Sequence, residues 1–299
     1  MSESASVRRP ARPGQPGWPG AAHWGTGAAM GPDTVCASAM SSSFLELARQ
    51  VDPQVLPAAP LVPASALGPQ ATTIVALCHA HGVVMAGDRR ATRGNEIAQR
   101  DIEKVFPADD HSLVGIAGAA GFAMDLAKLF AVELSHYEKL EGTPLSFDGK
   151  ANRLGALVRE HLGLAMQGFV VVPLFAGWDA HSRRGRIVGY DATGGHYEEK
   201  AFAATGSGAS FARGSLKKLY RSDFDEDRAA LACVQALFDA ADEDSATGGP
   251  DIARGLYPVV LSAGEQGVRR WSGEQVAELS ARLIEARMVR PDGPEAPLP

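Results

Sequence analysis

Thr72 is the residue of this sequence best placed to act as a nucleophile. It stands where a leader that holds ten of the nineteen prolines gives way to regular apolar runs. Cleavage of the chain just before Thr72 would leave a free α-amine beside the threonine hydroxyl. The Oγ1 atom could then attack a carbonyl while the α-amine, which titrates at roughly pH 7.7–8.0, acts as general base. The junction therefore predicts a nucleophile and its base within one residue.

Asp88 and Lys104 have the side chains that such a nucleophile needs as partners. A charged lysine beside Thr72 lowers the pKa of the α-amine and stabilises the alkoxide that develops on Oγ1. A carboxylate then holds that lysine in place. Residue type alone does not select these two, because the sequence holds other aspartates and lysines. A turn aspartate and a surface lysine are the alternative interpretation.

Other chemistries find little support in the sequence. It contains no G-x-S-x-G, HExxH or P-loop motif. Three cysteines are scattered without a CxxC spacing, which argues against a zinc site and a disulfide framework and fits a reducing cytosol. The turn histidines His79 and His81 lack a third ligand nearby. We therefore expect neither a metal nor a cofactor.

Composition indicates a globular protein with a sizeable core. The chain has 299 residues, of which 45% are hydrophobic and 21% charged. With a net charge of −6, the chain lacks the excess of positive charge that is typical of proteins that bind nucleic acid or an anionic membrane. The arginines near the start are followed by prolines and glycines rather than by an apolar segment, which argues against a secretory signal. The sequence predicts a cytoplasmic protein.

The leader, residues 1–71, is expected to be largely disordered. It has no lysine and cannot bury enough apolar surface to offset the entropy of ordering. Met30 and Met40 are alternative start sites. A capping box at Ser43–Glu46 predicts a short helix at about 43–51, too short to be stable unless it docks on a partner.

After the leader, strand-like and helical patterns alternate up to about Val289. Strands come in consecutive pairs, which argues against a parallel doubly wound sheet. The pattern favours antiparallel sheets stacked face to face, with helix pairs on their outer faces. A loop is expected at Arg93-Gly94-Asn95. The expected strands are 72–78, 82–87, 104–106, 113–117, 169–177, 186–191, 196–204, 256–263 and 267–271, and the expected helices are 120–139, 148–167, 206–220, 226–241 and 272–288.

Six separate motifs carry a resemblance to a known family. They are Thr72–Val75, Gly87–Arg90, Lys104, Gly115–Gly118, Gly206–Gly208 and Asp244–Gly249. In this order and spacing they resemble a proteasome β subunit of the bacterial, actinobacterial type, and the stretch Tyr137–Gly142 supports that subtype. The resemblance covers residues 72–288. It implies an N-terminal-nucleophile hydrolase with an α+β fold, a four-layer αββα sandwich, which agrees with the element order.

The resemblance implies a threonine peptidase that matures by cleaving itself. Thr72 matches the catalytic threonine, freed by autocatalytic removal of a propeptide. Residues 1–71 would then be the propeptide, 72–289 the peptidase domain and 290–299 a mobile C-terminal tail. The family normally has glycine before the nucleophile, and here Ala71 takes its place. Because glycine eases the tight turn needed for attack on the preceding carbonyl, we expect the Ala71–Thr72 bond to be cut slowly.

The other catalytic roles follow from the same resemblance. Asp88 matches the acid that orients the lysine, and Lys104 matches that lysine. The backbone N–H of Gly118 matches the oxyanion-hole donor, an interaction worth about 3–4 kcal/mol of barrier in such enzymes. Three further residues match those that support the threonine amine and its water, the third at a position that is often serine. They are Ser207, Asp244 and Thr247.

Substrate contacts are implied in the same way. The backbones of Thr92 and Ala120 match positions that pair with the substrate as an added strand, which gives affinity with little dependence on sequence. Four apolar residues match the lining of the pocket for the side chain before the cut bond, so we expect a preference for apolar side chains there. They are Ala91, Ile102, Ile116 and Met124.

The resemblance also implies an assembly. Rings of seven β subunits would stack between rings of proteasome α subunits, with Thr72 inside a closed chamber that receives unfolded proteins from a ring-shaped ATPase. Two alternatives remain. One is the peptidase subunit of the simpler two-component bacterial ATP-dependent protease, which also starts Thr-Thr but usually lacks a long propeptide. The other is an inactive structural ring subunit, although such subunits typically lose the threonine, the lysine or the acid.

Overall fold

The computed structural model describes residues 72–295. The expected propeptide with its helix at 43–51 lies outside the described residues, as do residues 296–299 of the expected tail. The strands are β1 Thr73–His79, β2 Gly82–Gly87, β3 Ala91–Arg93, β4 Glu96–Gln99, β5 Val105–Asp109, β6 Ser112–Gly118, β7 Val171–Asp179, β8 Arg184–Tyr190, β9 His196–Glu199, β10 Phe202–Gly206, β11 Val259–Gly264 and β12 Gly267–Arg270. The helices are α4 Ala120–Glu141, α5 Phe147–Glu160, α6 Leu162–Met166, α7 Ala209–Leu219, α8 Glu226–Glu243 and α9 Gly273–Val289, with a 3₁₀ turn η2 at Ile252–Arg254.

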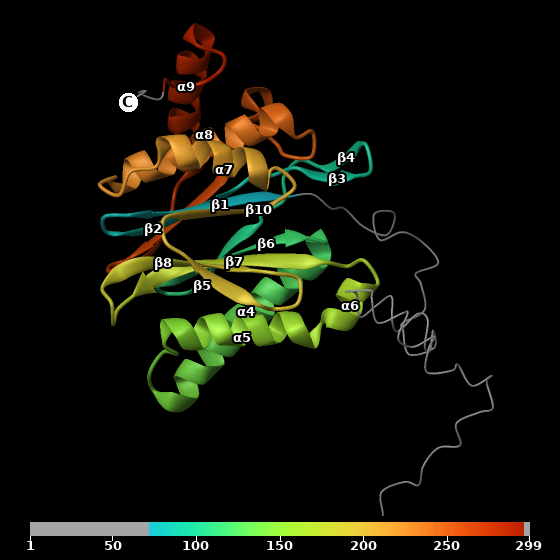
Figure 1. Ribbon diagram of the computed structural model, residues 1–299, viewed down its shortest axis with the longest axis vertical. Coiled ribbons are helices and arrows are strands. Elements are labelled where there is room, and N and C mark those ends of the chain that lie inside the picture. The colour runs from blue at the N-terminus through green and yellow to red at the C-terminus, as the bar shows by residue number, and fades with distance from the viewer. Residues whose placement is uncertain (1–71, 296–299) are drawn as a thin grey trace, which may run out of the picture. The chain divides into compact units, whose positions relative to one another are not determined.

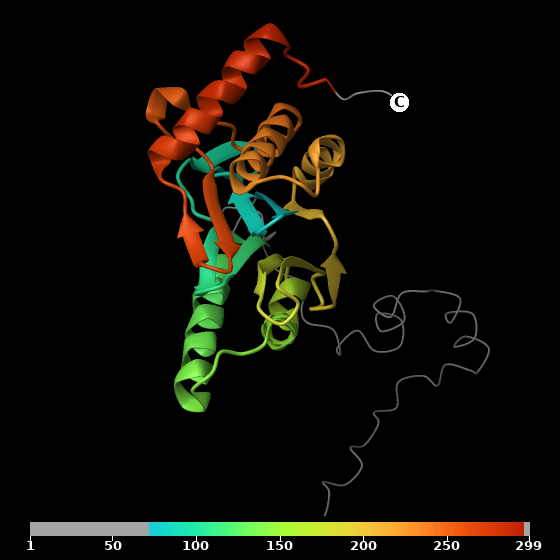
Figure 2. The same ribbon diagram turned by 90° about the vertical axis from the view of Figure 1, so that its left-hand side faces the viewer.

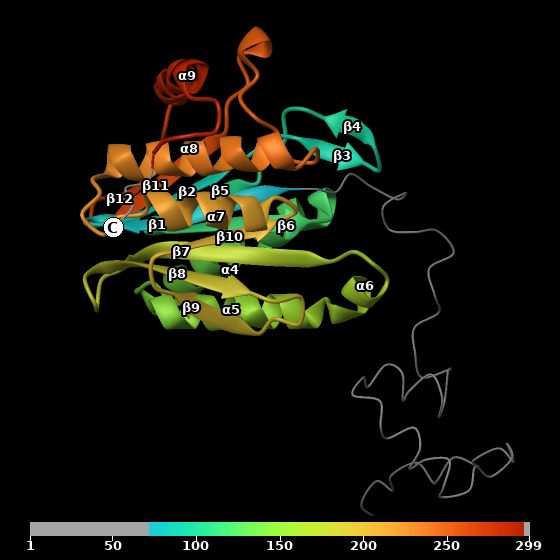
Figure 3. The ribbon, with the colours of Figure 1, turned by 45° about the horizontal axis from the view of Figure 1, so that its top comes forward.

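Two antiparallel five-stranded sheets lie face to face at the centre of the described chain (Figure 1). The first sheet has the order β10-β1-β2-β11-β12 and the second the order β5-β6-β7-β8-β9. Helices α7 and α8 cover the outer face of the first sheet, and α4 and α5 cover that of the second (Figure 3). This arrangement confirms the expected α+β sandwich of two antiparallel sheets between helix pairs.

The core consists of three apolar layers, because both faces of each sheet are covered. Alternate residues of β1 point to opposite faces, as the strand period of two requires. Val75 and Leu77 pack under α7 and α8, whereas Ile74 and Ala76 pack between the sheets. Helix α9 adds to the first of these layers and lies beside α8 (Figure 2). It begins at a capping box formed by Ser272 and Gln275.

The expected single strand 196–204 is wrong. The chain changes sheet within it, so that β9 pairs with β8 in the second sheet and β10 pairs with β1 in the first. At the crossing, the Ala201 carbonyl accepts a hydrogen bond of 2.8 Å from the Cys78 N–H. The residue pattern shows which positions are extended but not which sheet they join, so this crossing could not be seen in the sequence.

The expected helix 148–167 is also interrupted. It ends at Glu160 and resumes as the short α6 after His161. The His161 ring nitrogen Nδ1 lies 2.8 Å from the Leu157 carbonyl oxygen. In a continuous helix, the backbone N–H of His161 would donate to that same carbonyl. The N–H bonds the Val158 carbonyl instead, which closes the helix.

A short hairpin replaces the expected loop around Gly94. Strands β3 and β4 pair with each other on either side of Gly94 and Asn95, and Gly94 has a φ of +58°. This hairpin leads from the end of β2 to the start of β5 (Figure 1). It therefore lies between the two segments that carry Asp88 and Lys104.

Candidate functional site

Thr72 lies at the start of β1 and is only 3% exposed. Its carbonyl oxygen accepts a hydrogen bond of 3.0 Å from the N–H of Ser207. The end of β10 approaches closely at this point, since a Cβ on Gly206 would lie 1.7 Å from the Thr72 oxygen. Gly206 also has a φ of +105°, which side chains rarely allow. The glycine before Ser207 is therefore required to hold Thr72 in place.

Asp88 and Lys104 form a buried ion pair beside this strand end. Asp88 follows β2 directly and Lys104 precedes β5, so each is fixed by the end of a central strand. The Lys104 Nζ lies 2.6 Å from Oδ1 of Asp88, and their side chains are 3% and 0% exposed. Nζ also donates to the Arg90 carbonyl at 2.5 Å. Two acceptors thus define the position of the ammonium group.

The Asp88 carboxylate accepts hydrogen bonds from four groups. Oδ1 accepts from the N–H of Thr73 at 2.8 Å as well as from Lys104. Oδ2 accepts from the N–H of Arg90 at 3.0 Å and from that of Gly248 at 2.8 Å. A buried carboxylate needs such partners to remain ionised. Because one oxygen binds both Thr73 and Lys104, the ammonium is held next to the residue that follows Thr72.

Burial changes the protonation of Lys104. Removal from water disfavours the ammonium form and lowers the pKa of Lys104, while the Asp88 carboxylate opposes part of that shift. The net direction is downward. A lysine in this state gives up a proton more readily than one in solution.

Asp244 organises a second cluster at the C-terminal end of α8. Its Oδ2 accepts from the hydroxyls of Ser207 and Thr247, each at 2.6 Å, and its Oδ1 accepts from the N–H of Ala246 at 3.0 Å. Burial alone would raise the pKa of this carboxyl, but the three hydrogen bonds outweigh it and lower the pKa. The structure thus brings together three residues that the sequence placed near the threonine.

Thr73 joins this cluster and received no role from the sequence. Its side chain is fully buried, and its Oγ1 lies 2.6 Å from Oγ1 of Thr247. The N–H of Gly208 donates to the same Thr73 oxygen at 2.9 Å. A buried polar residue at the first position of an otherwise apolar strand is the signal that could have drawn attention to it.

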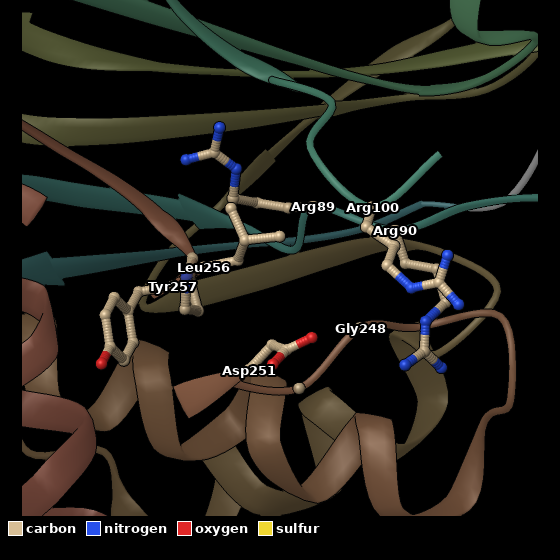
Figure 4. A pocket seen from close by; sticks show the side chains of 9 residues that line it. Arg89, Arg90, Arg100, Gly248, Asp251, Leu256 and Tyr257 are labelled. Atoms are coloured by element: carbon tan, nitrogen blue, oxygen red, sulfur yellow. The ribbon is translucent and has the colours of Figure 1, made fainter. Parts of the chain in front are cut away.

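Arg90 is a second residue without a role in the sequence analysis. Its Nη1 donates to the carbonyls of Ser245 at 2.9 Å and Thr247 at 3.1 Å. Figure 4 shows the Arg90 side chain beside the loop at Gly248, at the edge of a cavity of about 40 Å³. Arg90 therefore ties the loop after Asp244 to the segment after Asp88.

Gly118 lies at the end of β6 in an unusual backbone conformation. Its φ is +120°, and a Cβ would lie 2.0 Å from the Val170 carbonyl oxygen. Two residues earlier in the same strand, the Ile116 N–H donates to the Lys104 carbonyl at 3.2 Å. Gly118 thus belongs to the same end of the second sheet as Lys104.

The residues expected to line the specificity pocket are mostly inaccessible. Ala91, Ile102 and Ile116 are buried, and Met124 on α4 is partly exposed. Ile116 packs into the apolar layer beneath α4 and α5. Thr92 lies in β3, whose partner strand is β4, and Ala120 is the first residue of α4. Substrate pairing at Thr92 and Ala120 and the composition of the pocket stay predictions.

Residues 72–295 also bear on metal binding and on insertion into a membrane. Among them, no three His, Cys, Asp or Glu side chains gather in a way that could hold a metal ion. None of the helices formed by these residues is long and apolar enough to cross a membrane. Both cysteines in this part of the chain, Cys78 and Cys233, are free thiols.

Similarity to known proteins extends over most of the chain. Residues 69–252 match the family model described as Proteasome subunit. The proteasome subunit beta of Acidothermus cellulolyticus is 55% identical over 265 residues, which cover 86% of this chain and 91% of the relative. The proteasome subunit beta of Streptomyces griseus subsp. griseus is 52% identical over 261 residues, covering 86% and 93%. With the fold described above, these matches show that the chain belongs to the proteasome subunit family, as a β subunit of the actinobacterial type.

Proposed function

We propose that Thr72 is the nucleophile of this proteasome β subunit, a threonine-type endopeptidase, after cleavage of the Ala71–Thr72 bond. The observation that carries the proposal is the Asp88 carboxylate. Its Oδ1 binds the N–H of Thr73 at 2.8 Å and the Lys104 Nζ at 2.6 Å. A charged lysine is thereby fixed within one residue of the threonine.

The reaction uses both groups of a free Thr72. The α-amine accepts the Oγ1 proton as Oγ1 bonds to the substrate carbonyl carbon, and the charge that develops is stabilised by Lys104. Two of the Lys104 N–H groups go to Asp88 and Arg90, and we assign the third to Oγ1. The Gly118 N–H stabilises the oxyanion. Collapse of the tetrahedral intermediate breaks the C–N bond, and the protonated α-amine returns its proton to the leaving amine. An ester remains on Thr72, which water hydrolyses to release the acid and restore the hydroxyl.

Maturation uses the same nucleophile on its own chain. Before cleavage the Thr72 nitrogen is part of a peptide bond. Oγ1 bonds to the Ala71 carbonyl carbon, the C–N bond between Ala71 and Thr72 breaks, and the Oγ1 proton passes to the released Thr72 nitrogen. Water then hydrolyses the resulting ester. Residues 1–71 are then released as a propeptide and 72–289 act as the peptidase domain. Because alanine allows fewer backbone conformations than glycine, we expect this step to be slow compared with a variant carrying glycine at this position.

Assembly places the nucleophile in a closed space. The family implies a proteasome core that contains α subunits. We extend this to a heptameric β ring, a ring-shaped ATPase activator and unfolded proteins as substrates, in the cytoplasm. The two free thiols among the described residues support a reducing compartment. Confinement of Thr72 keeps an unselective nucleophile away from folded proteins.

The test compares wild type with Thr72→Ala in particles assembled with α subunits. We expect the wild type to hydrolyse peptides with apolar residues before the cut bond and to begin at Thr72 by intact mass. The Thr72→Ala particle should assemble, keep residues 1–71 and show no hydrolysis above buffer. Equal hydrolysis by the two particles would show that this chain is an inactive ring subunit. A wild-type chain that keeps Ala71 would refute the cleavage step.

A further inference from the structure

The hydroxyl of Thr73 connects two parts of the molecule that are far apart in the sequence. Thr73 begins β1, and Thr247 lies 174 residues later in the loop after α8. Both side chains have no exposed surface, and their Oγ1 atoms are 2.6 Å apart. Water therefore cannot replace either partner without a change in the packing.

The acceptor at the end of this connection fixes the direction of every hydrogen bond in it. The Asp244 carboxylate has no proton, so Thr247 must donate its hydroxyl proton to Asp244 Oδ2 at 2.6 Å. Thr73 must then donate to Thr247. The Thr73 oxygen accepts in turn from the N–H of Gly208 at 2.9 Å. The result is one oriented chain from Gly208 through Thr73 and Thr247 to Asp244.

Two branches connect this chain to the groups that the proposed reaction uses. Ser207 donates to the same Oδ2 of Asp244 at 2.6 Å, and the Ser207 N–H holds the Thr72 carbonyl at 3.0 Å. The Thr73 N–H binds Asp88 Oδ1, which also binds Lys104. Thr73 is therefore the residue at which the Asp88 cluster and the Asp244 cluster meet.

We propose that Thr73 is a positioning residue, whose hydroxyl sets the Asp244 cluster against Thr72 and the Asp88–Lys104 pair. The proposal rests on the proposed function, because the group that it positions is the Thr72 nucleophile. Thr73 itself does not touch the reacting atoms. Its hydroxyl is needed both as acceptor for Gly208 and as donor to Thr247, so a side chain of the same shape without the oxygen leaves both partners unsatisfied.

The experiment replaces Thr73 with valine and with serine in assembled particles, with activity measured per subunit that begins at Thr72. Valine keeps the shape and serine keeps the hydroxyl. We expect Thr73→Val to lower kcat about tenfold with KM changed less than twofold, because a lost hydrogen bond at this site acts on the nucleophile and not on substrate binding. Thr73→Ser should stay within twofold of wild type.

Thr205→Val is the matched control. Thr205 lies in the neighbouring strand β10, pairs with Ile74 of β1 and is 9% exposed. It is not part of the oriented chain, so its valine variant should keep the wild-type kcat. The proposal is overturned if Thr73→Val has the wild-type kcat, or if Thr205→Val and Thr73→Val lose kcat equally.

Coupling to Thr247 gives a second measurement. If Thr73→Val particles do not assemble, Thr247→Val breaks the same bond from the other end, and Thr247→Ser restores it. Where the single variants assemble, we expect the double variant to lose less kcat than the sum of the two single losses, because both variants remove the Thr73–Thr247 bond. Thr247→Val also removes the donor to Asp244 and should have the larger single effect. Additive losses would overturn the proposal. Failure of the proposed function gives a different result, namely hydrolysis that survives in Thr72→Ala.

Discussion

Two buried lysine–aspartate pairs at opposite ends of the sheets have the same geometry and different surroundings. Lys104 and Asp88 lie 2.6 Å apart beside Thr72, and Lys150 and Asp109 lie 2.6 Å apart at the other end of β5. Side-chain exposure is 3% and 0% in the first pair and 8% and 14% in the second. Distance and burial alone therefore do not distinguish a site from a structural contact.

The partners of the two carboxylates differ in origin. Asp109 accepts from its own turn, from the His111 N–H at 3.0 Å and the Ser112 hydroxyl at 2.7 Å. Asp88 accepts from groups up to 160 residues away, among them the N–H groups of Thr73 and Gly248. The Lys150–Asp109 pair fastens helix α5 to the β5–β6 hairpin. The Lys104–Asp88 pair gathers separate segments around one point, as the proposed reactive group requires.

The largest effect is expected from Lys104→Met. Methionine has a similar length but carries no charge, so Thr72 loses the group that we propose to stabilise its alkoxide. We expect kcat to fall by about 10²–10⁴-fold, the range typical of a positioned acid–base group. Steady-state hydrolysis of a fluorogenic peptide by assembled particles measures it. A fall of less than tenfold would contradict the role given to Lys104.

Lys150→Met applies the same change to the other pair and should affect stability instead. Removal of one partner of a buried ion pair costs about 3–5 kcal/mol, because the remaining charge stays buried and unpaired. Urea unfolding of the purified chain should show this loss, while kcat per folded subunit stays within twofold of wild type. A tenfold loss of kcat in folded Lys150→Met would remove the distinction between the pairs.

The sequence predicted the layers of this fold well. The spacing of apolar residues and the pairing of consecutive strands both depend on residues that are close together along the chain. Strands β1 and β2 were expected within one residue of their ends, and the sandwich followed from the order of elements. The change of sheet at Ala201 could not be predicted, since it depends on a contact with Cys78. The break at His161 depends on one side-chain bond that competes with the helix.

For the site, the sequence supplied candidates but not their geometry. Asp88 and Lys104 fitted by type, and only the resemblance selected them among other aspartates and lysines. Thr73 and Arg90 were missed because their contacts cross the chain: Thr73 to Thr247, and Arg90 to the carbonyls of Ser245 and Thr247. Backbone carbonyls have no sequence signature, so a residue that binds them is not visible before the fold is known.

The variant Asp109→Asn tests the Lys150–Asp109 pair through the pH dependence of the unfolding free energy. Burial by itself raises the pKa of Asp109, but Lys150 and the turn donors outweigh it, so the folded pKa lies below the ordinary 3.8. Stability from this group is present above the ordinary pKa and is lost as pH falls through the lowered one. At pH 7 we expect the variant to be less stable by about 2 kcal/mol.

Acid titration of unfolding gives the check. The difference in unfolding free energy between wild type and Asp109→Asn should be constant from pH 7 to about 5. It should then shrink as pH falls below about 4, where the carboxyl of the unfolded wild-type chain takes up a proton, until the folded carboxyl is protonated as well. A difference that does not change over this range would show that the Asp109 charge contributes nothing. Asp148→Asn is a suitable control, because its side chain is 70% exposed.

The smallest effect is expected from Arg90→Lys. The backbone of Arg90 holds Asp88 and Lys104, and this backbone is kept in the variant. Only the guanidinium bonds to the Ser245 and Thr247 carbonyls are lost, because lysine cannot reproduce the planar fork of arginine.

We expect Arg90→Lys to lower kcat by about three- to tenfold, because it loses one or two hydrogen bonds made by a charged donor at a partly exposed site. The loss should appear in kcat more than in KM, because the loop positions Asp244 rather than substrate. If the variant changes KM alone, the loop contacts the substrate instead. In that case the Asp244 cluster would act in substrate binding as well as in catalysis. The Asp88 cluster alone would then define the reactive end of the molecule.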